Sequence, residues 1–219
     1  MRPTESAQNY VKTIYAFVES GEEVSTTALA NRLGVSPASV TAMVKRLAHQ
    51  GLLAHRRYQG FQLTERGREV ALEVIRHHRL LEAYLCQSLG VTWDRVHDEA
   101  EVLEHAISEE LEDRIDELLG HPTHDPHGDP IPPKMGAYVE VRHPTLDSFP
   151  PGPAVIRRVS DRDPEALRYL SKLGLVPGTR ILVEGHGPFR GPVWMRVRGR
   201  QVAIGRELAS TISVSAPSP

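Results

Sequence analysis

Histidine and carboxylate side chains recur at helical spacing in the middle of the chain. Glu101, Glu104 and His105 stand at i, i+3 and i+4, which would place all three on one face of a helix, and His97 lies one turn earlier. Imidazole nitrogens and carboxylate oxygens together suit a divalent ion such as Mn(II), Fe(II), Co(II) or Zn(II). The spacing therefore predicts a site for one or two metal ions.

A second pair of such side chains, His78 and Glu82, is spaced at i, i+4 on the preceding helical stretch. Residues 76–135 hold five Lys and Arg against fourteen Asp and Glu, together with seven of the eleven histidines of the chain. A single His or Glu on a helix surface is usually only solvated. An acidic, histidine-rich segment with several such residues on neighbouring helices favours a metal site instead.

The same segment must be weighed as a catalytic motif. Residues 101–105 superficially resemble the H-x-x-E-H motif of metalloproteases, but the first position is Glu, so the pair of histidines that would hold a catalytic zinc is absent. The chain also lacks a Gly-rich phosphate loop and a nucleophile motif. The single cysteine, Cys86, excludes an internal disulfide and a cysteine-rich zinc site, and its apolar helical surroundings predict a core residue. We expect no enzymatic activity; the alternative, a metal-dependent hydrolase, would need an open cleft with a water-bearing ion.

The beginning of the chain predicts three short helices and a β-hairpin. Apolar residues at helical spacing define a helix over residues 5–20, and capping residues precede a short second helix. Gly34 then makes a tight turn before a third helix, which Ser36 can cap. Two strand-like runs follow, residues 52–55 and 61–63, joined by a basic, Gly-containing tip. This order of elements is that of a winged helix-turn-helix domain, expected over residues 1–72.

The third helix of this domain is expected to enter the DNA major groove. Its outward side chains are small or polar and permit close approach to base edges: Ser36, Ala38, Ser39, Thr41, Ala42 and Lys45. The hairpin tip carries Arg56, Arg57 and Tyr58, which can contact the phosphate backbone beside the groove. The alternative is a protein-interaction module, which the combination of helix spacing, turn glycine and wing arginines disfavours.

Three further helices are predicted: Thr64 to about Leu89, about Asp94 to about Ser108, and Glu109 to Leu119. We assign residues 73–140 to a helical domain that binds the metal and dimerises. Long apolar helices beyond a DNA-reading head need a partner surface, and a palindromic operator needs two heads. The sequence therefore predicts a homodimer on double-stranded DNA.

The last part of the chain predicts a linker, residues 141–152, and a small β-barrel of the SH3 type, residues 153–215. Short Val- and Ile-rich runs alternate there with Gly and Pro turns, and one helical stretch covers residues 164–173. The fold expected for the whole chain is mainly α with a small β component. No apolar run approaches the ~18 residues of a membrane span, and no signal peptide is evident, so we expect a cytoplasmic protein without membrane association.

Taken together, several motifs resemble the diphtheria toxin repressor family of iron- and manganese-dependent regulators, over nearly the whole chain. The motifs are residues 9–15, 78–82, 96–105, 126–132 and 173–178. The resemblance implies a metal-dependent, DNA-binding repressor of metal-uptake genes, with an SH3-like (FeoA-like) C-terminal domain. Two alternatives stay open: an iron-responsive regulator of the same family, and a winged-helix regulator that senses no metal.

The resemblance also implies two metal sites. The first uses His78, Glu82 and His97, completed by a residue of the barrel, for which Asp163 and Glu165 are candidates. The second uses Glu101, Glu104, His105 and, from the first helix, Asn9.

Three residues of the second site bear on the choice of metal. Iron-responsive members of the family tend to have a sulfur ligand at the position of Glu101, so a carboxylate there favours the harder ion, Mn(II). Asn9 offers a neutral amide oxygen, which is a weaker ligand than a carboxylate. Lys12 stands where short manganese regulators have a glutamate ligand, and an ammonium group cannot coordinate a metal.

Overall fold

The structure is a computed structural model that describes residues 3–56, 60–136, 138–139 and 141–217. Its contacts divide the chain into two compact units. The N-terminal unit consists of Met1–His78, Glu104–Ile107 and Pro132–Met135, and the C-terminal unit consists of Arg79–Leu103, Ser108–Ile131 and Gly136–Pro219. Among the described residues, none of the helices combines the length and the apolar character that crossing a bilayer requires.

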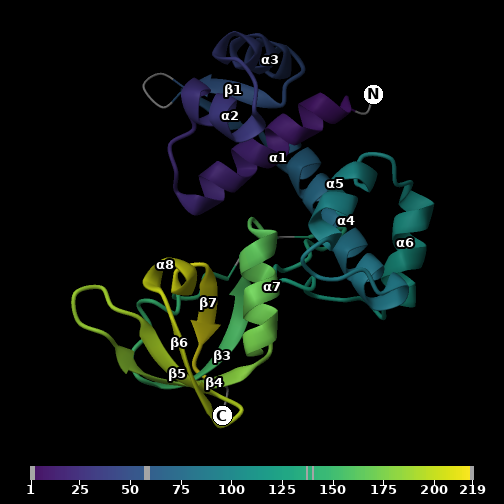
Figure 1. Ribbon diagram of the computed structural model, residues 1–219. Helices are drawn as coiled ribbons and strands as arrows, with labels where there is room; N and C mark the ends of the chain where they lie inside the picture. Colours follow the sequence, from purple (N-terminus) through teal and green to yellow (C-terminus); the bar gives the residue numbers. More distant parts are fainter. Residues whose placement is uncertain (1–2, 57–59, 137, 140, 218–219) are drawn as a thin grey trace. The chain divides into compact units, whose positions relative to one another are not determined.

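The N-terminal unit contains a winged helix-turn-helix domain, as predicted. Its elements are α1 (Glu5–Ser20), α2 (Thr26–Leu33), α3 (Pro37–His49), the antiparallel strands β1 (Leu53–Arg56) and β2 (Gly60–Leu63), and the start of α4 (Glu65–Leu89) (Figure 1). The Oγ of Ser25 accepts a hydrogen bond from the Ala28 N–H, and the Oγ of Ser36 accepts one from the Ser39 N–H. These two caps fix where α2 and α3 begin, within one residue of the predicted starts.

The core of this domain lies under one face of α1. Val11 and Ile14 of α1 are fully buried, as are Leu29 of α2 and Leu47 of α3. Val18 continues the same apolar spacing, but 46% of it is exposed. The apolar face of α1 is therefore covered only over its first three turns.

The C-terminal unit contains helices and an antiparallel β-domain. Its helices beyond α4 are α5 (Val96–Leu103) and α6 (Glu109–Leu118), and the β-domain comprises β3 (Gly152–Val159), α7 (Pro164–Leu173), β4 (Arg180–His186), β5 (Val193–Val197), β6 (Arg200–Ile204), α8 (Arg206–Ala209) and β7 (Ile212–Ser215) (Figure 1). The sheet order is β6-β5-β4-β3-β7, with every neighbouring pair antiparallel. Helix α7 has the bounds that the sequence predicts, whereas the bounds of the individual strands and the short helix α8 were not predicted.

The segment predicted as a linker belongs in part to the β-domain. Leu146 is fully buried in the core of that domain, and its N–H donates to the Ile212 carbonyl over 2.8 Å. Phe149 joins the same core, and Thr145 forms a bridge with Ser213 of β7. Two isolated apolar residues among prolines carry no periodicity, so this packing could not be predicted from the sequence.

Candidate metal centres

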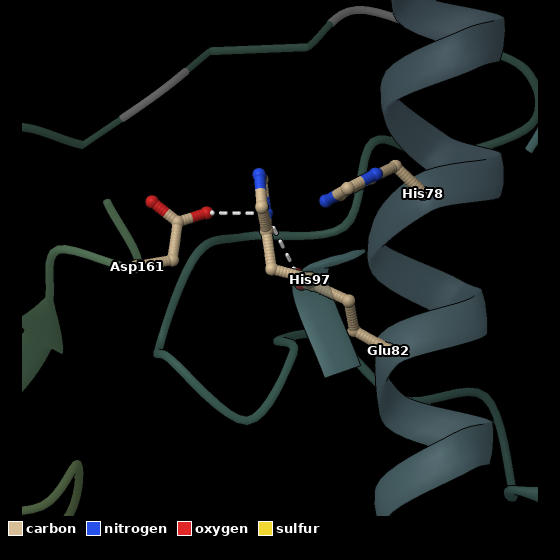
Figure 2. A group of neighbouring side chains, drawn as sticks. All are labelled: His78, Glu82, His97 and Asp161. Carbon is tan, nitrogen blue, oxygen red and sulfur yellow. Dashed lines mark hydrogen bonds and ion pairs between the residues drawn. The ribbon is translucent and has the colours of Figure 1, made fainter. Parts of the chain in front are cut away.

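A group of buried acidic and imidazole side chains surrounds Glu82 in the C-terminal unit. Glu82 projects from α4 and is fully buried, His97 comes from α5, and Asp161 from the loop after β3. Nδ1 of His97 lies 3.3 Å from Oε1 of Glu82 and 3.1 Å from Oδ2 of Asp161 (Figure 2). His78 lies one helical turn before Glu82 on α4. We call Glu82, His97 and Asp161, together with His127 and Asp125, the Glu82 centre.

His127 and Asp125 belong to the same group, although neither was predicted as a metal ligand. Ligand atoms of Glu82, Asp125 and His127 all lie within 4.8 Å of one another, and all three residues are buried. Nδ1 of His127 is 3.5 Å from Oε2 of Glu82. Both residues lie in the Pro- and Gly-rich loop after α6, where no periodicity predicts what a side chain faces. The available signal was the concentration of histidines in residues 76–135.

The ring of His127 is oriented by Trp93. Nε2 of His127 lies 2.6 Å from the Trp93 carbonyl oxygen, and the indole stacks on the imidazole with ring centroids 5.8 Å apart. A carbonyl oxygen only accepts hydrogen bonds, so Nε2 must carry the proton. In the neutral ring, Nδ1 then points its lone pair at Glu82. An outer hydrogen bond of this kind prepares an imidazole for metal coordination.

The electrostatics of the Glu82 centre are compatible with a bound cation. Hydrogen bonds to Asp161 and Glu82 raise the pKa of His97 to about 10, against the effect of burial. Burial would raise the pKa of Asp161, but the hydrogen bond and charge of His97 lower it. Burial and the negative charges of Asp129 and Glu82 raise the pKa of Asp125 well above its usual value. Buried carboxylates that repel one another, with imidazoles beside them, fit a divalent ion.

Metal binding at the Glu82 centre is expected to release protons. Because the pKa of His97 is about 10, its imidazole is protonated at pH 7, and a metal can coordinate it only as the neutral ring. We expect at least about one proton released per ion at pH 7 and an affinity that rises at least about tenfold per pH unit between pH 6 and 8. Isothermal titration with Mn(II) in buffers of different ionisation enthalpy measures this release. Binding heats that do not depend on the buffer would show the prediction to be wrong.

A second group, the Glu104 centre, lies in the N-terminal unit. Glu104 is fully buried; its Oε2 lies 2.5 Å from Nδ1 of His78, and its Oε1 lies 3.3 Å from Nε2 of His105. The ammonium group of Lys12, on α1, donates to both carboxylate oxygens over 2.7 and 2.9 Å. The sequence had placed His78 and Glu104 in different metal sites, whereas the structure brings them into contact.

Two neighbouring amides on α1 bear on this second group. Oε1 of Gln8, which is buried, lies 2.7 Å from Nδ1 of His105. Oδ1 of Asn9 is also buried and makes no hydrogen bond with any of the described residues. A buried carbonyl oxygen without a donor is costly unless a cation satisfies it, so Asn9 fits the predicted role of ligand. Gln8 was not predicted, because at the sequence level it is one polar residue among several.

Two details of the predicted metal sites differ in the structure. Helix α5 ends at Leu103, so Glu104 and His105 lie in the following turn rather than on the helix with Glu101. Glu101 has 42% of its side chain exposed and lies 3.9 Å from Nε2 of His97. The expectation that Glu101, Glu104 and His105 lie on one face of a single helix is therefore wrong.

The barrel residue that reaches His97 is Asp161 rather than the expected Asp163. The carboxylate of Asp163 caps α7, where it accepts hydrogen bonds from the N–H groups of Glu165 and Ala166. The side chain of Glu165 belongs to an exposed residue in the first turn of α7. A carboxylate that caps a helix is already occupied, which explains why the residue two positions earlier faces the metal centre.

The predicted DNA-contacting residues of α3 are exposed. They are Ser36, Ala38, Ser39, Thr41, Ala42 and Lys45. The hydroxyl of Thr41 donates to the Pro37 carbonyl over 3.0 Å, so it must rotate away from the helix to reach a base. In the wing, Arg56 ends β1, and Arg57 and Tyr58 lie outside the described residues.

Three models of protein families match consecutive parts of the chain. Residues 3–61 match the iron dependent repressor N-terminal DNA binding domain, residues 64–133 its metal binding and dimerisation domain, and residues 145–216 the FeoA domain. The segments follow the winged domain, the helices α4 to α6 with the loop after them, and the β-domain. The matches leave only residues 1–2, 62–63, 134–144 and 217–219 uncovered.

Individual relatives match over the same length. The iron-dependent repressor IdeR of Mycobacterium tuberculosis (strain ATCC 25618 / H37Rv) is 33% identical over 96% of both chains. A solved structure of a manganese-dependent transcriptional repressor in complex with manganese is 41% identical, with a TM-score of 0.88, and covers 96% of this chain and all of that one. The manganese regulator SloR is 32% identical, with a TM-score of 0.78, over 99% of this chain and all of that one. The chain therefore belongs to the iron-dependent repressor family, a family of metal-dependent, DNA-binding transcriptional repressors that includes IdeR and the diphtheria toxin repressor.

Proposed function

We propose that this repressor responds to manganese, binds a palindromic operator as a homodimer when metal occupies its centres, and represses genes for metal uptake in the cytoplasm. The observation that carries the proposal is the donor set. Both centres offer carboxylate and imidazole groups, the Glu104 centre has amide groups of α1 in addition, and Cys86, the one cysteine of the chain, is not part of either. Oxygen-rich sites without thiolate suit Mn(II) better than softer ions.

The manganese-dependent relative supports the choice of metal, and the iron-dependent relative marks the alternative. The name of IdeR specifies iron, whereas the solved structure with 41% identity contains manganese. Fe(II) prefers the same types of ligand, and structures of the related ScaR hold Cd(II) and Zn(II). The physiological choice then depends on the ligands of this chain and on the availability of each ion.

The Glu104 centre offers a direct connection between metal and DNA binding. It joins Gln8 and Lys12 of α1 to His105 and Glu104 in the turn after α5. A divalent ion supplies simultaneous bonds to ligands from different elements, and here it would hold α1 to that turn. Since α1 packs against the core shared with α2 and α3, fixing α1 also fixes the helix that reads DNA.

Selection of binding sites from random double-stranded DNA tests this proposal. With Mn(II) present, we expect the enriched sequences to share a two-fold symmetric motif with half-sites about one helical turn apart or a multiple of it. With a chelator in place of the metal, we expect no enrichment. Enrichment that is equal in both conditions would favour the regulator that senses no metal, and asymmetric motifs would contradict the dimer on a palindrome.

Exchange of Glu101 for cysteine is expected to change the metal preference. Thiolate in place of carboxylate favours softer ions, so Glu101→Cys should weaken activation by Mn(II) relative to Fe(II) and Zn(II) by about tenfold. The ratio of activation constants, measured anaerobically as operator binding, reports the change, with Glu99→Cys on the exposed surface of α5 as the matched control. An unchanged ratio in Glu101→Cys would mean that residue 101 does not set selectivity.

A further inference from the structure

We propose that Lys12 is a resident cation of the Glu104 centre, which occupies the carboxylate in the metal-free protein and must leave before a metal ion binds. The inference rests on the proposed role of Glu104 as a metal ligand. Nζ of Lys12 lies 2.7 Å from Oε2 and 2.9 Å from Oε1 of Glu104, so the ammonium group bridges both oxygens. Lys12 would then set how much metal is needed to activate the repressor.

The position of Glu104 explains why a resident cation is needed. Its side chain is completely buried, and a buried carboxylate without a counterion is strongly destabilising. In the metal-free protein Lys12, which is 92 positions away in the sequence, is the counterion of Glu104. Its Nζ also lies 3.3 Å from Nδ1 of His78. The pair therefore holds α1 to the turn after α5 without metal.

The ammonium group and a metal ion need the same atoms. Both bind the carboxylate oxygens of Glu104, and Lys12 has no lone pair with which to join the coordination sphere. Two cations at one carboxylate also repel each other. The side chain of Lys12 is 19% exposed and ends a flexible four-carbon stem, so it has a route to solvent. Metal binding is thus an exchange of one cation for another, in which the single ion pair between Lys12 and Glu104 gives way to bonds from several ligands at once.

A variant without the ammonium group tests this exchange. Leucine fills a similar volume and offers no ligand atom, so Lys12→Leu removes only the competitor. The site in question is the Mn(II) site that Glu104→Gln loses. In Lys12→Leu we expect the Mn(II) affinity of this site, measured by electron paramagnetic resonance of unbound Mn(II), to rise at least tenfold. We also expect the melting temperature of the metal-free variant to fall. Lys172→Leu, on the exposed face of α7, is the matched control and should change neither. Equal or weaker Mn(II) binding in Lys12→Leu would overturn the proposal.

A second measurement uses the unaltered protein and does not depend on the folding of a variant. Amine-reactive labelling, read by mass spectrometry, should modify Lys12 several-fold faster with Mn(II) than with a chelator, while Lys45 and Lys172 react equally in both. Labelling of Lys12 that stays the same or slows with metal would overturn the exchange. If Glu104→Gln retains every Mn(II) site of the unaltered protein, the proposed metal role of Glu104 is wrong. If Glu104→Gln loses a site but neither the Lys12→Leu affinity nor the labelling of Lys12 changes as expected, only the proposed exchange is wrong.

Discussion

Replacing both Glu104 and His105 with alanine is expected to abolish the effect of Mn(II) on operator binding. Coupling between two ligands typically changes affinity by about 5- to 150-fold, and we expect this factor to fall to about one in the double variant. Glu104 is the buried carboxylate of the Glu104 centre, and the imidazole of His105 is hydrogen-bonded to the side chain of Gln8 on α1. Without these two side chains, a metal has no ligand in the turn that it could connect to α1. Fluorescence anisotropy of labelled operator, with and without Mn(II), measures the factor.

A double variant on the surface of α6 controls for general effects of the substitutions. Glu110 and Arg114 form an exposed ion pair one helical turn apart, and their replacement by alanine should leave the metal response intact. The melting temperature of each variant without metal separates loss of metal response from loss of folding. A folded Glu104→Ala, His105→Ala protein that keeps the full response would remove the Glu104 centre from the mechanism.

Replacing Gly128 with alanine is expected to destabilise the C-terminal unit by about 3 kcal/mol and to weaken the Glu82 centre. Gly128 has φ +88°, and a Cβ there would lie 1.9 Å from the carbonyl oxygen of Arg157 in β3. The adjacent His127 carbonyl accepts a hydrogen bond from the Val159 N–H over 2.9 Å, so the loop and β3 are packed backbone to backbone. Relief of the clash would move His127 away from Glu82 and lower the Mn(II) affinity.

Gly178 provides a matched control for this substitution. Its φ of +84° is nearly the same, but a Cβ at this position would meet nothing within 4 Å. Gly178→Ala should therefore cost only the conformational strain, about 1 to 2 kcal/mol. Urea unfolding of both variants measures the difference. Equal losses of unfolding free energy would mean that the loop tolerates the Cβ, and that Gly128 does not position His127.

Elements defined by local chemistry could be predicted from the sequence. The serine caps of α2 and α3 and the left-handed Gly34 between them act within a few residues, and the winged domain follows from them. Helix α7 has its predicted bounds for the same reason, because Asp163 caps it and Gly174 ends it. Local hydrogen bonds of this kind depend little on the rest of the fold.

Contacts between distant segments could not be predicted in the same way. The loop that carries His127 has no periodic pattern, and its approach to Glu82 depends on packing against β3. Nothing local in the sequence shows that the loop after β3 reaches His97, and this distant contact is what brings Asp161 to that imidazole. The sequence showed that Lys12 is unable to coordinate a metal, but its bond to Glu104 requires the folded chain.

The central claim, that metal binding and DNA binding are coupled, is tested most directly by measuring each affinity with and without the other ligand. The four titrations use Mn(II) and the operator obtained by selection. Thermodynamic linkage requires that the operator raise the affinity for Mn(II) by the same factor as Mn(II) raises the affinity for the operator. We predict two equal factors, both of at least about fivefold. Operator affinity that is the same for the chelated and the Mn(II)-loaded protein would contradict the account.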